Sequence, residues 1–132
     1  MLLKLTQADL MKGQPIMPRW YEAEVTKVEH KTSKDGASLN YIYTFRVPAA
    51  KNAEIDNYFN SKAPGMMAPF IAAVQKKTLA EIIVGMEGGT LDFDTESLVG
   101  KKLQIEVKNE SYEGRLTNKI SAFLPEGAQT PF

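Results

Sequence analysis

Cysteine and long hydrophobic runs are both missing from this sequence. The 132 residues include no cysteine, which excludes disulfide bonds and cysteine-ligated metal sites. The apolar stretch over residues 1–13 is broken by Lys4, Gln7 and Asp9, so it is too short to span a membrane and lacks the apolar centre of a signal peptide. We therefore expect a soluble protein of the cytoplasm that does not bind membranes.

A net charge is also missing. Sixteen basic and sixteen acidic residues give a formal net charge of zero, which argues against a strongly basic, non-specific nucleic-acid binder. The charges are not evenly spread, because Glu87, Asp92, Asp94 and Glu96 follow one another with no basic residue among them. The rest of the chain is therefore mildly positive, and one face could be basic while the molecule is neutral.

Signals for catalysis and for metal binding are nearly absent. The single histidine, His30, lies between Glu29 and Lys31 at the edge of an expected turn, as a solvated side chain would. No HxH, HExxH or GxxxxGK[ST] spacing occurs. The acidic residues of the run DFDTE (92–96) could bind a cation, but Asp94 has a simpler role as a helix cap. The sequence predicts no enzyme, no metal site and no cofactor.

The pattern that is present is an alternation of apolar and polar residues, which indicates half-buried strands. With 43% hydrophobic residues the chain can form a core, and we expect one domain over residues 1–125 with a mobile tail over residues 126–132. Five segments alternate in this way: residues 19–31, 38–47, 55–60, 102–110 and 115–125. In the last of them we expect Leu116, Ile120, Ala122 and Leu124 to share one face.

The order of these segments predicts the fold. In the first segment the apolar residue after Val25 is Val28, and this slip of one position indicates a β-bulge. Between the third and fourth segments the period becomes helical, with Pro69 in a first turn, Thr78 as an N-cap and Gly85 as a stop. We therefore predict an all-β protein with a small helical insertion, a five-stranded Greek-key barrel of the OB-fold type. An open α+β sheet is the alternative.

Short motifs in the same segments resemble a known family. They are SKDG at residues 33–36, FRV at 45–47, GK at 100–101 and YEGRLTN at 112–118. With these motifs, residues 19–125 resemble small phage-encoded OB-fold proteins of replication and recombination modules, similar to phage single-stranded DNA-binding proteins. The resemblance implies an OB-fold, a single-stranded DNA ligand and replication or recombination proteins as partners in the host cytoplasm. The ending Pro131-Phe132 is similar to the partner-recruiting tip of bacterial single-strand binders, without the acidic run before it.

A single-strand binder needs cations for phosphates and rings for base stacking. OB-folds carry them on strands two and three and on the loops after strands one and four. The candidate cations are Lys31, Lys34, Arg46, Lys108, Arg115 and Lys119, and the candidate rings are Tyr58, Tyr112 and Tyr43.

The position of Tyr43 depends on the register of its strand. Tyr41, Tyr43, Phe45 and Val47 share one face, which points into the core if the alternation is unbroken and is exposed if a second bulge interrupts it. The unbroken register is favoured. In that register Tyr58 and Tyr112 are better candidates for base stacking than Tyr43.

Two hypotheses follow from the sequence. The first is sequence-independent binding of single-stranded DNA in phage-type replication or recombination, and RNA is not distinguished from DNA because both carry phosphates and bases. The second is an OB-fold protein-interaction module that binds no nucleic acid, which the zero net charge and the acidic run favour.

Overall fold

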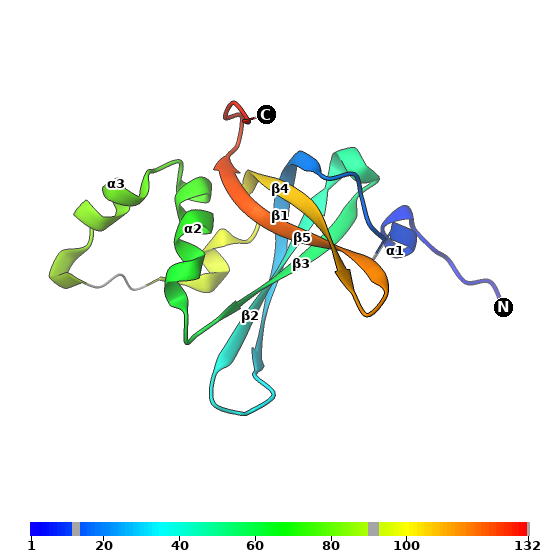
Figure 1. Cartoon of the computed structure of the whole chain (residues 1–132), viewed down its shortest axis with the longest axis horizontal. Helices are drawn as coiled ribbons and strands as arrows, with labels where there is room; N and C mark the ends of the chain where they lie inside the picture. Colours follow the sequence, from blue (N-terminus) through cyan, green and yellow to red (C-terminus); the bar gives the residue numbers. More distant parts are fainter. Residues whose placement is uncertain (12–13, 90–92, 132) are drawn as a thin grey trace.

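A five-stranded antiparallel sheet forms most of the computed structural model, which describes residues 1–11, 14–89 and 93–131 (Figure 1). The strand order is β3-β2-β1-β4-β5. The strands are β1 (Arg19–Thr32), β2 (Leu39–Val47), β3 (Ala53–Asn60), β4 (Lys102–Tyr112) and β5 (Arg115–Pro125). All five predicted strands are confirmed, and so is the helical segment between the third and the fourth.

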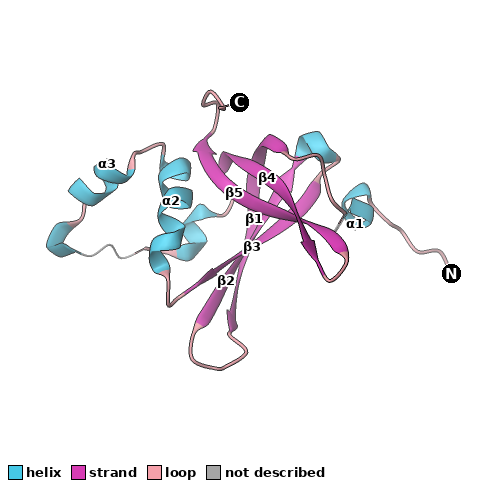
Figure 2. Cartoon of the chain, in the orientation of Figure 1, coloured by secondary structure: helices cyan, strands magenta, loops and turns pink. Residues whose placement is uncertain are grey.

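Short helices complete the fold. The α-helices are α1 (Gln7–Met11), α2 (Ala68–Gln75) and α3 (Leu79–Val84), and the 3-10 helices are η1 (Pro48–Ala50), η2 (Pro64–Met67), η3 (Glu87–Gly89) and η4 (Thr95–Leu98). Figure 2 shows α2 and α3 together at one end of the sheet. As predicted, Thr78 is the N-cap of α3, and the structure shows in addition a capping box, in which Thr78 and Glu81 each accept the other's backbone N–H. Asp94 caps η4 by accepting the N–H of Glu96 at 3.0 Å.

The first strand connects the two halves of the sheet. Its residues 19–24 pair with β4 and its residues 24–32 pair with β2. The register shifts between Val25 and Lys27, which leaves Thr26 unpaired and confirms the predicted bulge. Because a bulge bends its strand, one long strand can serve both partners.

An aromatic cluster fills the core beneath β2. The side chains of Tyr43, Phe45 and Phe70 have no exposed surface. The ring centroid of Phe70 lies 4.9 Å from that of Tyr43 and 5.2 Å from that of Phe123. The favoured register, with Tyr43 and Phe45 pointing inward, is confirmed.

The faces of β5 differ from the prediction. Glu106 pairs with Ala122 and Val107 with Ile120, so Ser121 is an extra residue in β5. Beyond this bulge the faces exchange, because side chains alternate with a period of two. Phe123 therefore joins the core, and the expectation that Ala122 shares the face of Ile120 is wrong; Leu124 likewise follows Ala122 to the other face.

The chain ends are partly held. Ile16 donates its backbone N–H to Asn118 Oδ1 at 2.9 Å, and Asn118 Nδ2 donates to the carbonyl of Gln14 at 2.7 Å. The tail, predicted to be mobile, is tied at its start, where Gly127 N donates to Glu22 at 3.2 Å. Phe132 and Asp92, which the sequence analysis singled out, lie outside the described residues.

No helix among the described residues is long and apolar enough to cross a membrane.

Candidate nucleic-acid interface

The first candidate surface is the outer side of β1, β2 and β3. Residues directly opposite one another on neighbouring strands project to the same side, so the pairing defines this surface row by row. Its four rows are Glu24, Arg46 and Glu54; Lys27, Thr44 and Asp56; Glu29, Ile42 and Tyr58; and Lys31, Asn40 and Asn60. We call it the β1–β3 face. Four carboxylates against three cations give it a formal charge of −1.

The three cations of the β1–β3 face all have carboxylate partners. Arg46 Nη2 lies 2.5 Å from Glu24 Oε1. Lys27 and Lys31 lie 3.4 Å and 3.6 Å from the two carboxylate oxygens of Glu29. The hydrogen bond from Lys27, together with the charges of both lysines, holds the pKa of Glu29 below its usual value. Two predicted phosphate contacts, Arg46 and Lys31, therefore already have a carboxylate partner in the protein, and Lys31 shares its partner with Lys27.

The residues in the middle of the β1–β3 face are not accessible to a ligand. Ile42 and Thr44 are buried although they point away from the core, and Thr44 Oγ1 donates to Asp56 Oδ1 at 2.7 Å. Tyr58, opposite Ile42 in the register, is 63% exposed. Its predicted exposure is confirmed, so a ring is available for stacking, but the surface around it is net acidic.

The second candidate surface is one side of the β4–β5 hairpin. The pairs Lys108–Lys119, Glu110–Thr117 and Tyr112–Arg115 lie opposite one another there, and we call these six residues the hairpin face. The turn is tight, since Glu113 and Gly114 both have positive φ (49° and 78°), as in the two-residue turns that match the strand twist. The pairing therefore continues to the tip.

The hairpin face is basic. Three cations against one carboxylate give it a formal charge of +2, although Glu113 in the turn lies nearby. Lys119 lies 3.8 Å from Glu110, whereas Lys108 and Arg115 form no ion pair with any other described residue. Lysines directly opposite each other repel, which costs stability unless an anion lies between them. This arrangement favours a phosphate ligand.

The hairpin face also offers a ring. Tyr112 is 62% exposed beside Arg115, and no ring contact occupies it within the described chain. A base stacked on Tyr112 would leave its phosphates within the positive surface of the neighbouring strand. Four predicted site residues, Lys108, Tyr112, Arg115 and Lys119, are thus brought together on one surface.

The prediction that Tyr43 stacks on a base is wrong. Its ring is fully buried, and its hydroxyl donates to the carbonyl of Thr95 at 2.7 Å. Burial, followed by the negative charges of Glu96 and Asp94, raises the pKa of Tyr43 to about 12. The alternation in β2 is unbroken, so this ring packs in the core.

Lys34 lies apart from the other cations. It is exposed in the loop of the β1–β2 hairpin, which projects from the body in Figure 1, and it forms no ion pair with another described residue. Beside it, Asp35 accepts hydrogen bonds from Ser33 and from the backbone of Ala37, which lower its pKa. The same carboxylate lies 3.8 Å from Lys62. Lys34 thus has Asp35 and its partner Lys62 close by, and no ring stands beside it in the sequence.

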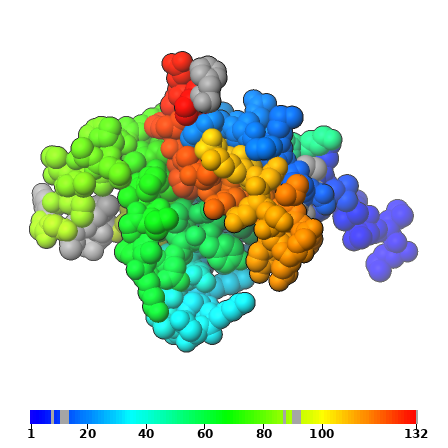
Figure 3. Space-filling view, viewed as in Figure 1, coloured from blue at the N-terminus to red at the C-terminus, as the bar shows by residue number. Residues whose placement is uncertain are grey.

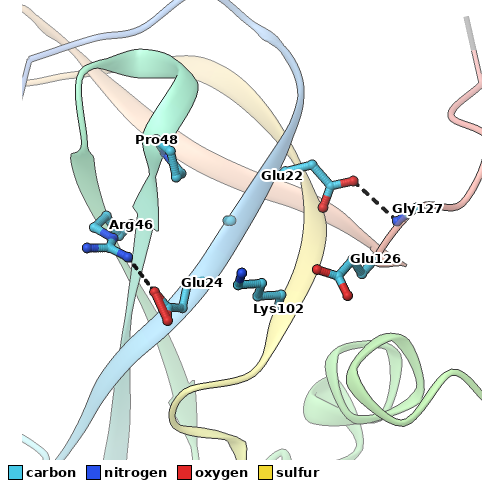
Figure 4. A pocket seen from close by; sticks show the side chains of 8 residues that line it. Glu22, Glu24, Arg46, Pro48, Lys102, Glu126 and Gly127 are labelled. Atoms are coloured by element: carbon cyan, nitrogen blue, oxygen red, sulfur yellow. Dashed lines mark hydrogen bonds and ion pairs between the residues drawn. The ribbon is translucent and has the colours of Figure 1, made fainter.

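A hollow beside the β1–β3 face was not predicted from the sequence. Its volume is about 540 Å³, and Figure 4 shows Glu22, Glu24 and Glu126 around it with Arg46 and Lys102. Three carboxylates against two cations make it unsuited to phosphate. Its residues come from β1, β2, η1, β4 and the tail, so only the tertiary fold brings them together.

The remaining candidates for metal binding or catalysis are the acidic side chains and His30. Among the described residues, no three His, Asp or Glu side chains gather closely enough to hold a metal ion. The Nε2 atom of His30 lies 2.9 Å from Thr95 Oγ1, and its ring packs edge-on against Tyr41. His30 therefore connects β1 to η4.

Comparison with known proteins assigns no family to this chain. No protein-family model matches it, and no curated protein is significantly similar to it in sequence. The resemblance to phage single-strand binders therefore stays a prediction.

Proposed function

We propose that this protein binds single-stranded DNA without sequence preference, and that it does so through the hairpin face. One observation carries the proposal: Lys108, Arg115 and Lys119 share a surface with the exposed ring of Tyr112. Cations that replace phosphate counterions and rings that stack on any base are the two requirements of such binding. No base edge has to be read, so the binding is independent of sequence.

The fold supports the same proposal. We propose that the sheet closes into an OB-type barrel, because β1 pairs with both β2 and β4 across its bulge and the helices follow β3. OB barrels commonly bind single strands. The resemblance of the sequence motifs to phage proteins supports a role in replication or recombination.

The test is a titration of fluorescently labelled oligo-dT with the full chain at two salt concentrations. We expect saturable binding that weakens with salt, with a log–log slope of about 0.7 for each phosphate neutralised. Oligo-U in a parallel titration compares RNA with DNA. The absence of saturable binding at low salt would refute the proposed function.

A protein-interaction module is the second candidate function. It is favoured by the β1–β3 face, where each of the three cations is paired and the net charge is −1. Under this hypothesis the titration shows no binding to oligo-dT, whereas a pull-down with the full chain recovers a specific protein.

A further inference from the structure

The helical end of the molecule has an open apolar groove. Its volume is about 540 Å³, within the range of about 300–1,000 Å³ typical of ligand-binding cavities. The lining is almost entirely apolar and includes Tyr41, Met67, Ile71, Ile82 and Phe93. On its rim, Ile83 is 65% exposed and Leu79 nearly half exposed. An apolar surface of this kind marks a binding site more often than a free surface.

A second apolar feature is left uncovered in the same chain. Residues 1–6, here called the N-terminal segment, contain Leu2, Leu3 and Leu5, all exposed and Leu2 almost completely so. The segment has no regular structure and leads to α1, where Thr6 and Asp9 cap each other's backbone N–H groups. Three exposed leucines in a segment without regular structure are suited to an open groove, because their side chains can reach a partner without the loss of any helix or strand.

The two features lie far apart in one molecule. Figure 1 shows α3 at one end of the longest axis and the N-terminus at the other, and the space-filling view shows the same separation (Figure 3). The segment of one molecule therefore projects away from its own groove and toward the solvent, where a second copy can meet it.

Charge supports the same pairing. The N-terminal segment carries one charged side chain, Lys4, between Leu3 and Leu5. Thr95 lines the groove, and its sequence neighbours Asp94 and Glu96 are both exposed and form no ion pair with another described residue. A lysine carried into the groove between leucines would meet carboxylates at this edge.

We propose that the apolar groove of one copy binds the N-terminal segment of a second copy. The two surfaces are different, so the contact is head-to-tail, and each bound molecule still offers a free groove or a free segment. Such a contact produces open chains or closed rings of molecules. The proposal does not depend on nucleic-acid binding, and its test is carried out without nucleic acid.

The test is sedimentation velocity of the full chain over a wide range of concentrations. We expect the wild type to sediment faster as the concentration rises, whereas Leu3→Glu and Ile83→Glu remain monomeric. Both sites are exposed, so neither variant should unfold, and circular dichroism with urea unfolding checks this. Leu116→Glu is the matched control, since Leu116 is an exposed leucine in neither surface and its variant should associate as the wild type does.

Mixing the two defective variants identifies the contact. Leu3→Glu retains an intact groove and Ile83→Glu retains an intact segment, so an equimolar mixture should form dimers that do not grow further. Lys4→Glu should associate more weakly than the wild type. If adding Glu96→Lys to this variant restores the association, Lys4 lies at the acidic edge of the groove. A wild type that stays monomeric at every concentration overturns the proposal, and so does an Ile83→Glu variant that associates normally.

Discussion

The β1–β3 face and the hairpin face contain the same kinds of residue but differ in what their cations contact. Each has three cations and one exposed tyrosine. On the β1–β3 face every cation lies within 3.6 Å of a carboxylate oxygen, whereas on the hairpin face Lys108 and Arg115 form no ion pair with a described residue. The formal charges are −1 and +2.

The difference shows that the number of cations does not identify a phosphate site. A cation already paired with a carboxylate must lose that partner, or share it, before it neutralises a phosphate. A cation held opposite another cation gains from the same phosphate, because the ligand also relieves their repulsion. The hairpin face is therefore the better candidate, although OB-folds commonly bind with strands two and three.

The largest effect is expected from reversing both unpaired cations of the hairpin face. In Lys108→Glu/Arg115→Glu, two phosphate contacts are lost, so the log–log salt slope for oligo-dT should fall by about 1.4, at about 0.7 for each contact. The affinity should fall more than in any variant of the β1–β3 face. Fluorescence anisotropy at several salt concentrations measures both.

The matched control is Lys77→Glu/Lys101→Glu. Both lysines are exposed, form no ion pair with a described residue and lie outside the two faces, so the change in net charge is the same. If the log–log salt slope falls by the same amount in this control, general electrostatic attraction explains the binding and the hairpin face has no special role.

The next effect compares the two exposed tyrosines. Tyr112→Ala should lose about 1–3 kcal/mol of binding free energy, because a stacked base is lost, while Tyr112→Phe keeps the ring and most of the affinity. Tyr58→Ala should lose less, since its surroundings are acidic. Titrations of the three variants with oligo-dT measure this, and a greater loss in Tyr58→Ala would reverse our ranking of the two faces.

Much of the fold follows from local patterns in the sequence. The strands, the bulge in β1, the N-cap at Thr78 and the inward register of Tyr43 all depend on neighbours a few residues apart. The bulge at Ser121 does not, because an apolar residue stands on either side of the slip and both registers look alike in the sequence. Only the packing of Phe123 into the aromatic core selects the observed register.

The contacts of the candidate site residues were harder to predict than the strands, because some of them join residues that are distant in sequence. The sequence analysis named all four hairpin residues as candidates, and the tight turn places them opposite one another in pairs. The carboxylate beside Arg46 is Glu24, which is distant in sequence, so this ion pair becomes visible only once the pairing of β1 with β2 is known. The pairing of Arg46 is therefore a property of the register, whereas Lys27 and Lys31 pair with Glu29 inside β1, two residues away in each direction.

A smaller effect, on stability and not on binding, is expected from Tyr43, which lies on the core side of β2. Tyr43→Phe removes the hydrogen bond to Thr95 and should lower the free energy of unfolding by about 1 kcal/mol, with oligo-dT binding unchanged. The pKa of Tyr43 is about 12 in the folded protein and about 10 in an unfolded chain. The unfolded chain therefore releases this proton first, and stability is lost as the pH rises from about 10 to about 12.

Urea unfolding on both sides of that window measures this contribution. The wild type should lose stability there, whereas Tyr43→Phe should lose less, because it has no phenol at this position. If Tyr43→Phe keeps its stability but binds oligo-dT more weakly, Tyr43 belongs to the binding site and not to the core.

The smallest effect tests whether pairing is what weakens the β1–β3 face. Glu24→Gln releases Arg46, and since an exposed ion pair contributes about 0.2–1 kcal/mol, oligo-dT affinity should rise by no more than about fivefold. Glu54→Gln is the matched control, because Glu54 lies on the other side of Arg46 in the register and forms no ion pair with a described residue, so it changes the charge equally but releases no cation. A larger gain in Glu24→Gln than in Glu54→Gln means that the ion pair itself withholds Arg46 from phosphate. Equal gains mean that net charge alone separates the two faces, and the hairpin face would then owe its advantage to its charge of +2 and not to its unpaired cations.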